Sequence, residues 1–189
     1  MLQEILTVGF FTAFLSAAVR LAMPLMYGGL GEERAGILNI GMEGVMLSGA
    51  FFSFAGAWYF HSIPVGLLCG MLGGMAVSLL HGLLTIRLAK DQSVSGLALN
   101  MLMLGVTSFL YKLVSSGQSY QQVETLPSLP IPGLSGIPVI GEAFFNRDIL
   151  TYLLYVLIVV AFFFYRNTNW GLNFIAVGEH PRAAESAGI

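Results

Sequence analysis

The chain has 189 residues, of which 56% are hydrophobic and only 10% are charged. An ordinary soluble domain carries about 25% charged residues, and a soluble core of this size could not bury so much apolar surface. The net charge of −2 and the lack of a basic cluster argue against a nucleic-acid partner. We therefore predict an all-α integral membrane protein in a lipid bilayer. The single cysteine, Cys69, excludes a disulfide within the chain.

The first apolar run predicts a membrane span from about Ile5 to Tyr27. No basic region precedes it, so we interpret it as a retained span and not as a cleaved signal. Residues 28–34 combine glycines with charged residues, which predicts a flexible connection.

A second apolar run, Ala35 to Phe60, is long enough to cross a bilayer with some tilt. Near its start lie Asn39 and Glu43, which on a helix would sit one above the other on one face. A carboxylate within a span costs roughly 2.5–3.5 kcal/mol, so this face should meet protein or water. Gly41 and Gly44 thin the face and let a helix backbone or a solute approach. The pattern fits a solute path and also an anchor between helices.

The third predicted span runs from about Ile63 to Ile86 and contains Gly66, Gly70 and Gly74. These form two overlapping GxxxG units, which predict close packing against another helix. His81 lies near the end of this span. A lone histidine there is more commonly hydrogen-bonded, and a role as a proton or solute ligand is the alternative.

A polar link precedes the fourth predicted span, Val94 to Leu113, and offers Asp91 and Ser93 as N-cap residues. Asn100 lies inside this span, where an amide needs a hydrogen-bond partner. We prefer a structural bond for Asn100, and keep it with Asn39 and Glu43 as candidates for the solute path.

Residues 115–147 form the one long connection and hold four of the seven prolines. Such a length is typical of functional or mobile loops. The fifth predicted span, Ile149 to Tyr165, is short and uniformly apolar.

Lysine and arginine positions predict the orientation in the membrane. With five spans and the N-terminus outside, six of the eight basic residues fall on the cytoplasmic face and two, Lys112 and Arg147, fall outside. The connection over residues 115–147 is then extracytoplasmic, and the tail over residues 166–189 is cytoplasmic.

The tail predicts a short helix between Pro181, which suits a first helical position, and Gly188, which suits a stop. Ala183, Ala184 and Ala187 keep its surface low, so that it could enter a groove on another protein. By composition alone, an interfacial helix or a plain loop fits as well.

Two blocks of the sequence resemble a known family. Residues 33–44 read Glu-Arg-Ala-Gly-Ile-Leu-Asn-Ile-Gly-Met-Glu-Gly, and residues 176–189 read Ala-Val-Gly-Glu-His-Pro-Arg-Ala-Ala-Glu-Ser-Ala-Gly-Ile. They are similar to the early span and the cytoplasmic loop of bacterial ABC-importer permeases of the ribose/branched-chain amino acid type. Residues 91–100 also fit the entry to the fourth span in the nucleoside and simple-sugar branch. His180 departs from the asparagine expected there, which weakens the cap of the tail helix.

The resemblance implies a single transmembrane permease domain over residues 1–189, incomplete because such permeases continue through further spans. It also implies a second permease subunit, cytoplasmic ATPase subunits that drive transport, and an extracytoplasmic solute-binding protein. The tail helix would dock on the ATPase through residues that we expect to act in coupling: Gly178, Pro181, Arg182, Ala183, Ala184, Glu185 and Gly188.

We predict a permease for nucleosides, by resemblance to that branch, with simple sugars or riboflavin as alternatives. No GxxxxGK[ST] motif occurs, so ATP hydrolysis is assigned to a separate subunit, and no cofactor or metal is expected. A secondary transporter with Glu43 as a proton relay is the rival of another class. An intramembrane enzyme is disfavoured because GxSxG, HExxH and paired intramembrane aspartates are missing from the sequence.

Overall fold

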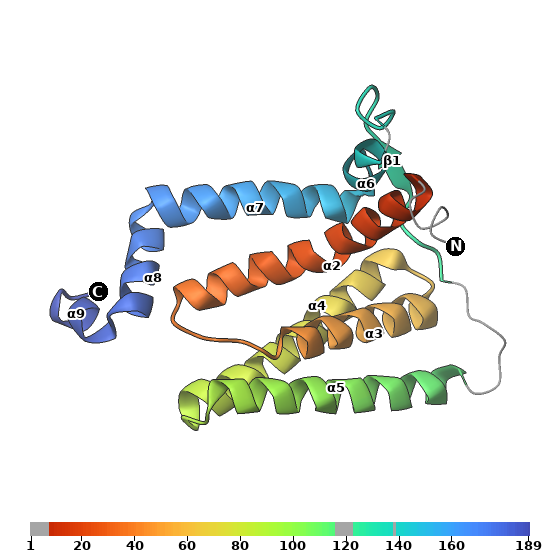
Figure 1. The fold of residues 1–189 in the computed structure, drawn as a ribbon. Helices are drawn as coiled ribbons and strands as arrows, with labels where there is room; N and C mark the ends of the chain where they lie inside the picture. The colour runs from red at the N-terminus through yellow and green to blue at the C-terminus, as the bar shows by residue number, and fades with distance from the viewer. Residues whose placement is uncertain (1–7, 116–122, 138) are drawn as a thin grey trace. The chain divides into compact units, whose positions relative to one another are not determined.

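The computed structural model describes residues 8–115, 123–137 and 139–189. The chain divides into two compact units, Ile37–Thr125 and a second one that combines Met1–Gly36 with Leu126–Ile189. Both units consist mainly of helices (Figure 1). Residues 5–7 of the predicted first span, and residues 116–122 and 138 of the predicted long loop, lie outside the described residues.

The unit Ile37–Thr125 is a bundle of long helices that lie side by side (Figure 1). Its elements are α3 (Met42–Phe60), α4 (Ile63–Gly82), the π-helical turn η1 (Leu83–Arg87) and α5 (Gln92–Ser115). His61 ends α3 in a left-handed conformation, with φ of 48°, and Pro64 follows in the first turn of α4. In η1 the Leu88 amide donates to the Leu83 carbonyl at 3.0 Å, which is the wide i to i+5 bond of a π turn. Asp91 caps α5 by accepting from the Val94 amide at 2.9 Å, as the sequence predicts.

Helices α3 and α4 approach closely because glycine removes side chains from the contact. A Cβ built on Gly66 would lie 2.6 Å from the Ala57 Cβ, and one on Gly70 would lie 2.8 Å from the Gly49 carbonyl oxygen. A Cβ on Gly74 would meet Val45 at an ordinary 3.7 Å. Within the GxxxG pattern, the helices therefore touch more tightly at Gly66 and Gly70 than at Gly74.

The other unit contains α2 (Val8–Arg34), a loop region and the C-terminal helices. The loop region has two short antiparallel strands, β1 (Ser128–Pro130) and β2 (Asn146–Asp148), in which Leu129 pairs with Arg147. Helix α6 (Ile140–Phe145) precedes β2 and packs against α2. Arg147 is 3% exposed, and its Nε donates to the Ala143 carbonyl at 2.6 Å. These strands are three residues each, and the structure is otherwise mainly helical, in agreement with the predicted all-α class.

The chain then forms three consecutive helices, α7 (Ile149–Asn167), α8 (Asn169–Glu179) and α9 (Pro181–Ser186). Thr168 separates α7 from α8: its hydroxyl donates to the Phe164 carbonyl at 2.6 Å and accepts from the Gly171 amide at 3.0 Å. Sequence analysis missed α8. At the end of α9, Gly188 is left-handed, with φ of 77°, and the Ile189 amide donates to the Ala184 carbonyl at 3.0 Å. This is a Schellman motif, so Pro181 and Gly188 bound the tail helix as predicted.

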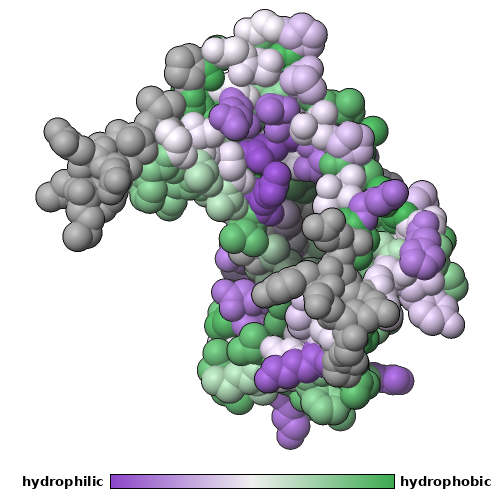
Figure 2. All heavy atoms as spheres, turned by 90° about the vertical axis from the view of Figure 1, so that its right-hand side faces the viewer, coloured by the Kyte–Doolittle hydropathy of each residue, from purple (hydrophilic) through white to green (hydrophobic). Residues whose placement is uncertain are grey.

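Many large apolar side chains remain exposed, as a membrane protein requires. On the face drawn in Figure 2, hydrophobic residues reach the surface between hydrophilic ones. Leu79 is 68% exposed and Met101 is 67% exposed. Among the residues that the structure describes, three helical segments are long and apolar enough to cross a membrane: Ile63–Arg87, Gln92–Ser115 and Ile149–Asn167. Within α2, Gly9–Leu21 forms a shorter apolar stretch. The number of five spans stays a prediction.

Two predicted boundaries near the N-terminus are wrong. Residues 28–34 are helical because α2 continues to Arg34, so they are not a flexible connection. The second predicted span begins at Ala35, whereas α3 begins at Met42. Gly36, with φ of 77°, ends α2 because an L side chain would disfavour this conformation, and the chain enters α3 through a non-helical segment.

The glycine contact between α3 and α4 gives a prediction on stability. Gly66→Ala and Gly70→Ala should each lower the free energy of unfolding by about 1–3 kcal/mol, the usual range for overpacking. Gly74→Ala is the matched control on the same helix and should be neutral or stabilising by up to about 1 kcal/mol, the helix propensity gained. Thermal unfolding in detergent measures all three. An equal loss at the three positions would contradict the contact.

Candidate functional site

The candidate site is the start of α3 and the non-helical segment 37–41 that leads into it. Asn39 is 7% exposed, and its Oδ1 accepts from the Gly41 amide at 2.8 Å. This bond to a residue two positions on is the local turn by which asparagine competes with helix formation. Asn39 therefore lies before the helix, and the prediction that it stacks with Glu43 on one helical face is wrong.

Asn100, on α5, ties this segment to the bundle. Its Oδ1 accepts from the Gly44 amide at 2.7 Å, and its Nδ2 donates to the Ile40 carbonyl at 2.9 Å. One side chain thus satisfies an otherwise unpaired amide in the first turn of α3 and a carbonyl of the non-helical segment. The structural bond that the sequence favours for Asn100 is present, and a direct role of Asn100 in the solute path stays a prediction.

Gln92, also on α5, supports the segment 37–41 near its start. Its Oε1 accepts from the Leu38 amide at 2.7 Å. Sequence analysis missed Gln92 and Gly96, although a signal was present: Gln92, Gly96 and Asn100 are spaced by four and so share one face of a helix. That face of α5 supports the whole segment.

Glycines let the two backbones meet. A Cβ on Gly96 would lie 2.7 Å from the Gly41 nitrogen, and a Cβ on Gly44 would lie 3.1 Å from the Leu99 carbonyl oxygen. Gly41 and Gly44 were predicted as packing residues, and the structure places both against α5. Without these approaches the Asn100 amide could not reach across.

Glu43 lies in the first turn of α3 and is exposed. Among the residues that the structure describes, its carboxylate has no hydrogen bond or ion pair, and the amides of Met42 and Glu43 have no acceptor. An open helix start of this kind presents backbone donors with a partial positive charge, next to a carboxylate acceptor. The site can therefore both donate to and accept from an uncharged polar solute.

Asn100 lies beyond the first turns of α5. At 1.5 Å per residue it lies about 12 Å along α5 from Gln92, and Gln92–Ser115 is a candidate span. Non-helical backbone at membrane depth is tolerated where protein buries it or where it lines a cavity. Transporters use such broken helices to bind solutes.

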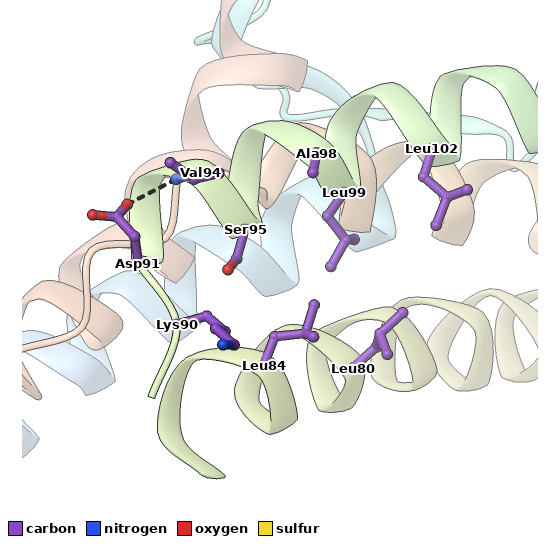
Figure 3. Close-up of a pocket in the computed structure, with 9 residues that line it drawn as sticks. All are labelled: Leu80, Leu84, Lys90, Asp91, Val94, Ser95, Ala98, Leu99 and Leu102. Atoms are coloured by element: carbon purple, nitrogen blue, oxygen red, sulfur yellow. Dashed lines mark hydrogen bonds between the residues drawn. The ribbon is translucent and has the colours of Figure 1, made fainter. Parts of the chain in front are cut away.

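A separate cavity of about 470 Å³ lies between the end of α4 and the start of α5 (Figure 3). Most of its lining is aliphatic, including Leu80, Leu84 and Leu102, and Lys90, Asp91 and Ser95 lie at one end. None of the three path candidates lines it. Its apolar walls offer a polar solute few partners, so we do not place the solute there.

His81 is 4% exposed, and both ring nitrogens lack a hydrogen-bond partner among the described residues. The bonded state that the sequence favours is therefore not found for its side chain; the His81 carbonyl accepts from the Thr85 hydroxyl at 2.9 Å. In the described part of the chain, no three histidine, cysteine or acidic side chains gather as a metal site would require.

The predicted coupling residues lie in α8, in α9 and, for Gly188, just after α9. Pro181 opens α9, and Arg182, Ala183, Glu185 and Gly188 are exposed, so they are free to meet a partner. Ala184 is only 4% exposed and is buried by this chain itself. The prediction that Ala184 belongs to the low outer surface of the tail helix is therefore wrong. Gly178 faces the end of α2.

Comparisons with known proteins identify a family for this chain. A family model described as "Branched-chain amino acid transport system / permease component" matches residues 5–189. The chain is 41% identical over 170 residues to the "Guanosine ABC transporter permease protein NupQ" of Bacillus subtilis, covering 86% of this chain and 53% of that protein. It is 36% identical over 176 residues to the "Nucleoside ABC transporter permease protein NupC" of Lactococcus lactis, covering 88% and 56%.

A third similar protein is the "Putative glucose ABC transporter permease protein TsgC13" of Haloferax volcanii, which is 37% identical over 187 residues, covering 95% of this chain and 56% of that protein. The chain thus spans about half the length of the curated relatives that it matches. No solved structure matches it significantly.

The bonds of Asn100 give a second prediction. Asn100→Leu removes both bonds and leaves the Gly44 amide unpaired, which should lower the free energy of unfolding by about 1–3 kcal/mol. Asn100→Asp keeps the acceptor for Gly44 and should lose less. Asn173→Leu, at an exposed position of α8, is the control and should stay within about 0.5 kcal/mol. Thermal unfolding in detergent compares the three variants. An Asn100→Leu protein that is as stable as wild type would contradict the stabilising role of the Asn100 hydrogen bonds.

Proposed function

Because this chain belongs to the family of permease components of branched-chain amino acid transport systems, we propose that it forms part of an ATP-driven importer of nucleosides. The observation that carries the substrate is its identity of 41% and 36% to permeases named for guanosine and for nucleosides. The chain is a multi-pass protein of the plasma membrane, in keeping with its apolar helices.

The chemistry at the start of α3 supports an uncharged polar solute. The exposed Glu43 carboxylate accepts hydrogen bonds, and the amides of Met42 and Glu43 donate them. A sugar ring with several hydroxyl groups needs both kinds of partner. The ribose of a nucleoside and a simple sugar share this chemistry. Simple sugars are therefore the second candidate, supported by the relative named as a putative glucose permease.

The assembly that we propose has the parts of an ABC importer. Two permease subunits enclose the path, a solute-binding protein delivers the solute from outside, and cytoplasmic ATPase subunits drive the change of access. The sequence has no GxxxxGK[ST] motif, which supports ATP hydrolysis on a separate subunit. The exposed residues of α9, among them Arg182 and Ala183, would contact that subunit.

The orientation that we propose has the N-terminus outside and five spans. It rests on the excess of lysine and arginine on one face. The loop containing β1, α6 and β2 is then extracytoplasmic, and α8 and α9 are cytoplasmic.

Thiol accessibility tests this orientation. In a Cys69→Ala background, Gly136→Cys in the loop should react with an impermeant thiol reagent in intact cells. Ser186→Cys in α9 should react only after the cells are opened. Both positions are exposed in the structure, so burial does not limit the reaction. The reverse pattern would contradict the orientation and the cytoplasmic role of the tail.

Substitutions of Glu43 test whether the start of α3 binds the solute. Its carboxylate makes no bond within the described part of the chain, so Glu43→Gln and Glu43→Leu should both melt within a few degrees of wild type. If Glu43 binds the solute, the loss of a charged hydrogen bond of about 1.5–3 kcal/mol should reduce uptake by roughly 10- to 100-fold.

Uptake is measured in vesicles that contain the complete permease with its ATPase and binding protein. It should require ATP and persist when the proton gradient is collapsed. Uptake that follows the proton gradient would support the rival secondary transporter with Glu43 as a proton relay. A Glu43→Leu protein that melts early but transports normally per folded molecule would instead assign Glu43 an anchoring role.

A further inference from the structure

At Gly178, the end of α8 contacts backbone atoms at the end of α2. A Cβ built on Gly178 would collide with the Arg34 carbonyl oxygen and lie 2.8 Å from the Ala35 carbonyl carbon. A Cβ on Gly36 would in turn lie 2.8 Å from the Gly178 carbonyl oxygen. Real Cβ atoms do not approach so closely, so this contact exists only because both residues are glycine. We call this contact the Gly36–Gly178 joint.

Gly36 is fixed at this place by its own conformation as well. Its φ is 77°, and its amide donates to the Glu33 carbonyl at 3.0 Å, which closes the last turn of α2. An L side chain would be strained in this conformation. The joint therefore connects the last turn of one helix, α8, to the residue that ends another, α2.

Only a short length of chain separates Gly36 from the next residue that is held by a hydrogen bond. Only Ile37 separates Gly36 from Leu38, whose amide is bonded to Gln92. At 3.8 Å between neighbouring Cα atoms, at most about 7.6 Å of chain separates Gly36 from that bonded residue. Further along, the Ile40 carbonyl is bonded to Asn100. A displacement of Gly36 must therefore move the segment 37–41 or break its bonds to α5.

We propose that the Gly36–Gly178 joint transmits the movement of α8 and α9 to the segment 37–41, and through it to the start of α3, where Glu43 lies. This inference rests on the proposed function, since an ATPase must move the tail. It assigns Gly178 to a contact inside the chain and not to the ATPase surface, for which the exposed residues of α9 remain available. Gly36 and Gly178 are positioning residues, which act on the solute site through the segment between them and it.

The first test observes the segment directly. Leu38, which is 48% exposed, is replaced by cysteine as the sole thiol of the complete importer in vesicles, and its rate of labelling is followed with and without ATP. The rate should change by about fivefold or more, since coupling between sites typically spans about 5- to 150-fold. An unchanged rate in an importer that hydrolyses ATP would overturn the proposal. A changed rate without nucleoside uptake would support the joint and refute the proposed substrate.

The second test removes the joint. Gly178→Ala and Gly36→Ala should abolish the effect of ATP on Leu38→Cys labelling and reduce uptake at least about tenfold, while the ATPase still co-purifies. Gly105→Ala is the helical control, and Gly133→Ala, with φ of 87°, is the control for backbone strain; neither glycine has an atom within 4 Å of a built Cβ. Both controls should retain the response.

Two outcomes of the second test would contradict the Gly36–Gly178 joint. Loss of ATPase binding in Gly178→Ala would place Gly178 on the partner surface and overturn the joint. A normal ATP response in Gly178→Ala would overturn it as well. Melting temperatures are measured on all variants, and if Gly178→Ala is unfolded, the first test alone decides the proposal.

Discussion

Backbone hydrogen bonding is the constraint on which the arrangement of α3, α4 and α5 depends. Within a membrane, water cannot satisfy the free amides and carbonyls that appear wherever a helix is interrupted. Here the interruption before α3 is supported by three side-chain amides, from Asn39, Gln92 and Asn100. Because Asn100 bonds on both sides of the break, the segment and the helix start hold one position relative to α5. The open donors and the carboxylate of Glu43 are then left at a defined place.

Close approach between backbones is the second requirement, and glycine meets it at two contacts of the unit Ile37–Thr125. Gly66 and Gly70 bring α4 onto α3, and Gly96 and Gly44 bring α5 onto the start of α3. Packing in membranes gains no hydrophobic driving force from helix association, so contact area and short polar bonds carry more of the stability. The buried hydroxyl of Ser48, which donates to the Val45 carbonyl at 2.8 Å, fits into the resulting α3–α4 contact.

Local signals in the sequence predicted the parts of the fold that local chemistry determines. The cap at Asp91, the start of the tail helix at Pro181 and its stop at Gly188 are examples. The start of α3 was missed because an apolar run does not reveal the turn made by Asn39 or its partner Asn100, which is far along the chain. The sequence likewise shows that Ala184 has a small side chain, but the burial of Ala184 depends on how α9 folds back. The exposure of Glu43 likewise depends on tertiary packing, which the local sequence does not reveal.

The π turn at the end of α4 determines where this hairpin can change in length. A π turn contains more residues than an α turn, so removing one residue from Leu83–Arg87 would leave a regular α-helical turn. In a regular helix, one residue corresponds to a rotation of about 100°. Deleting a residue within α3 or the main part of α4 would turn the glycine face away from its partner, whereas a deletion in η1 changes only the chain that follows. In this chain, a change of length between α4 and α5 is therefore best accommodated at η1 and the short link to α5.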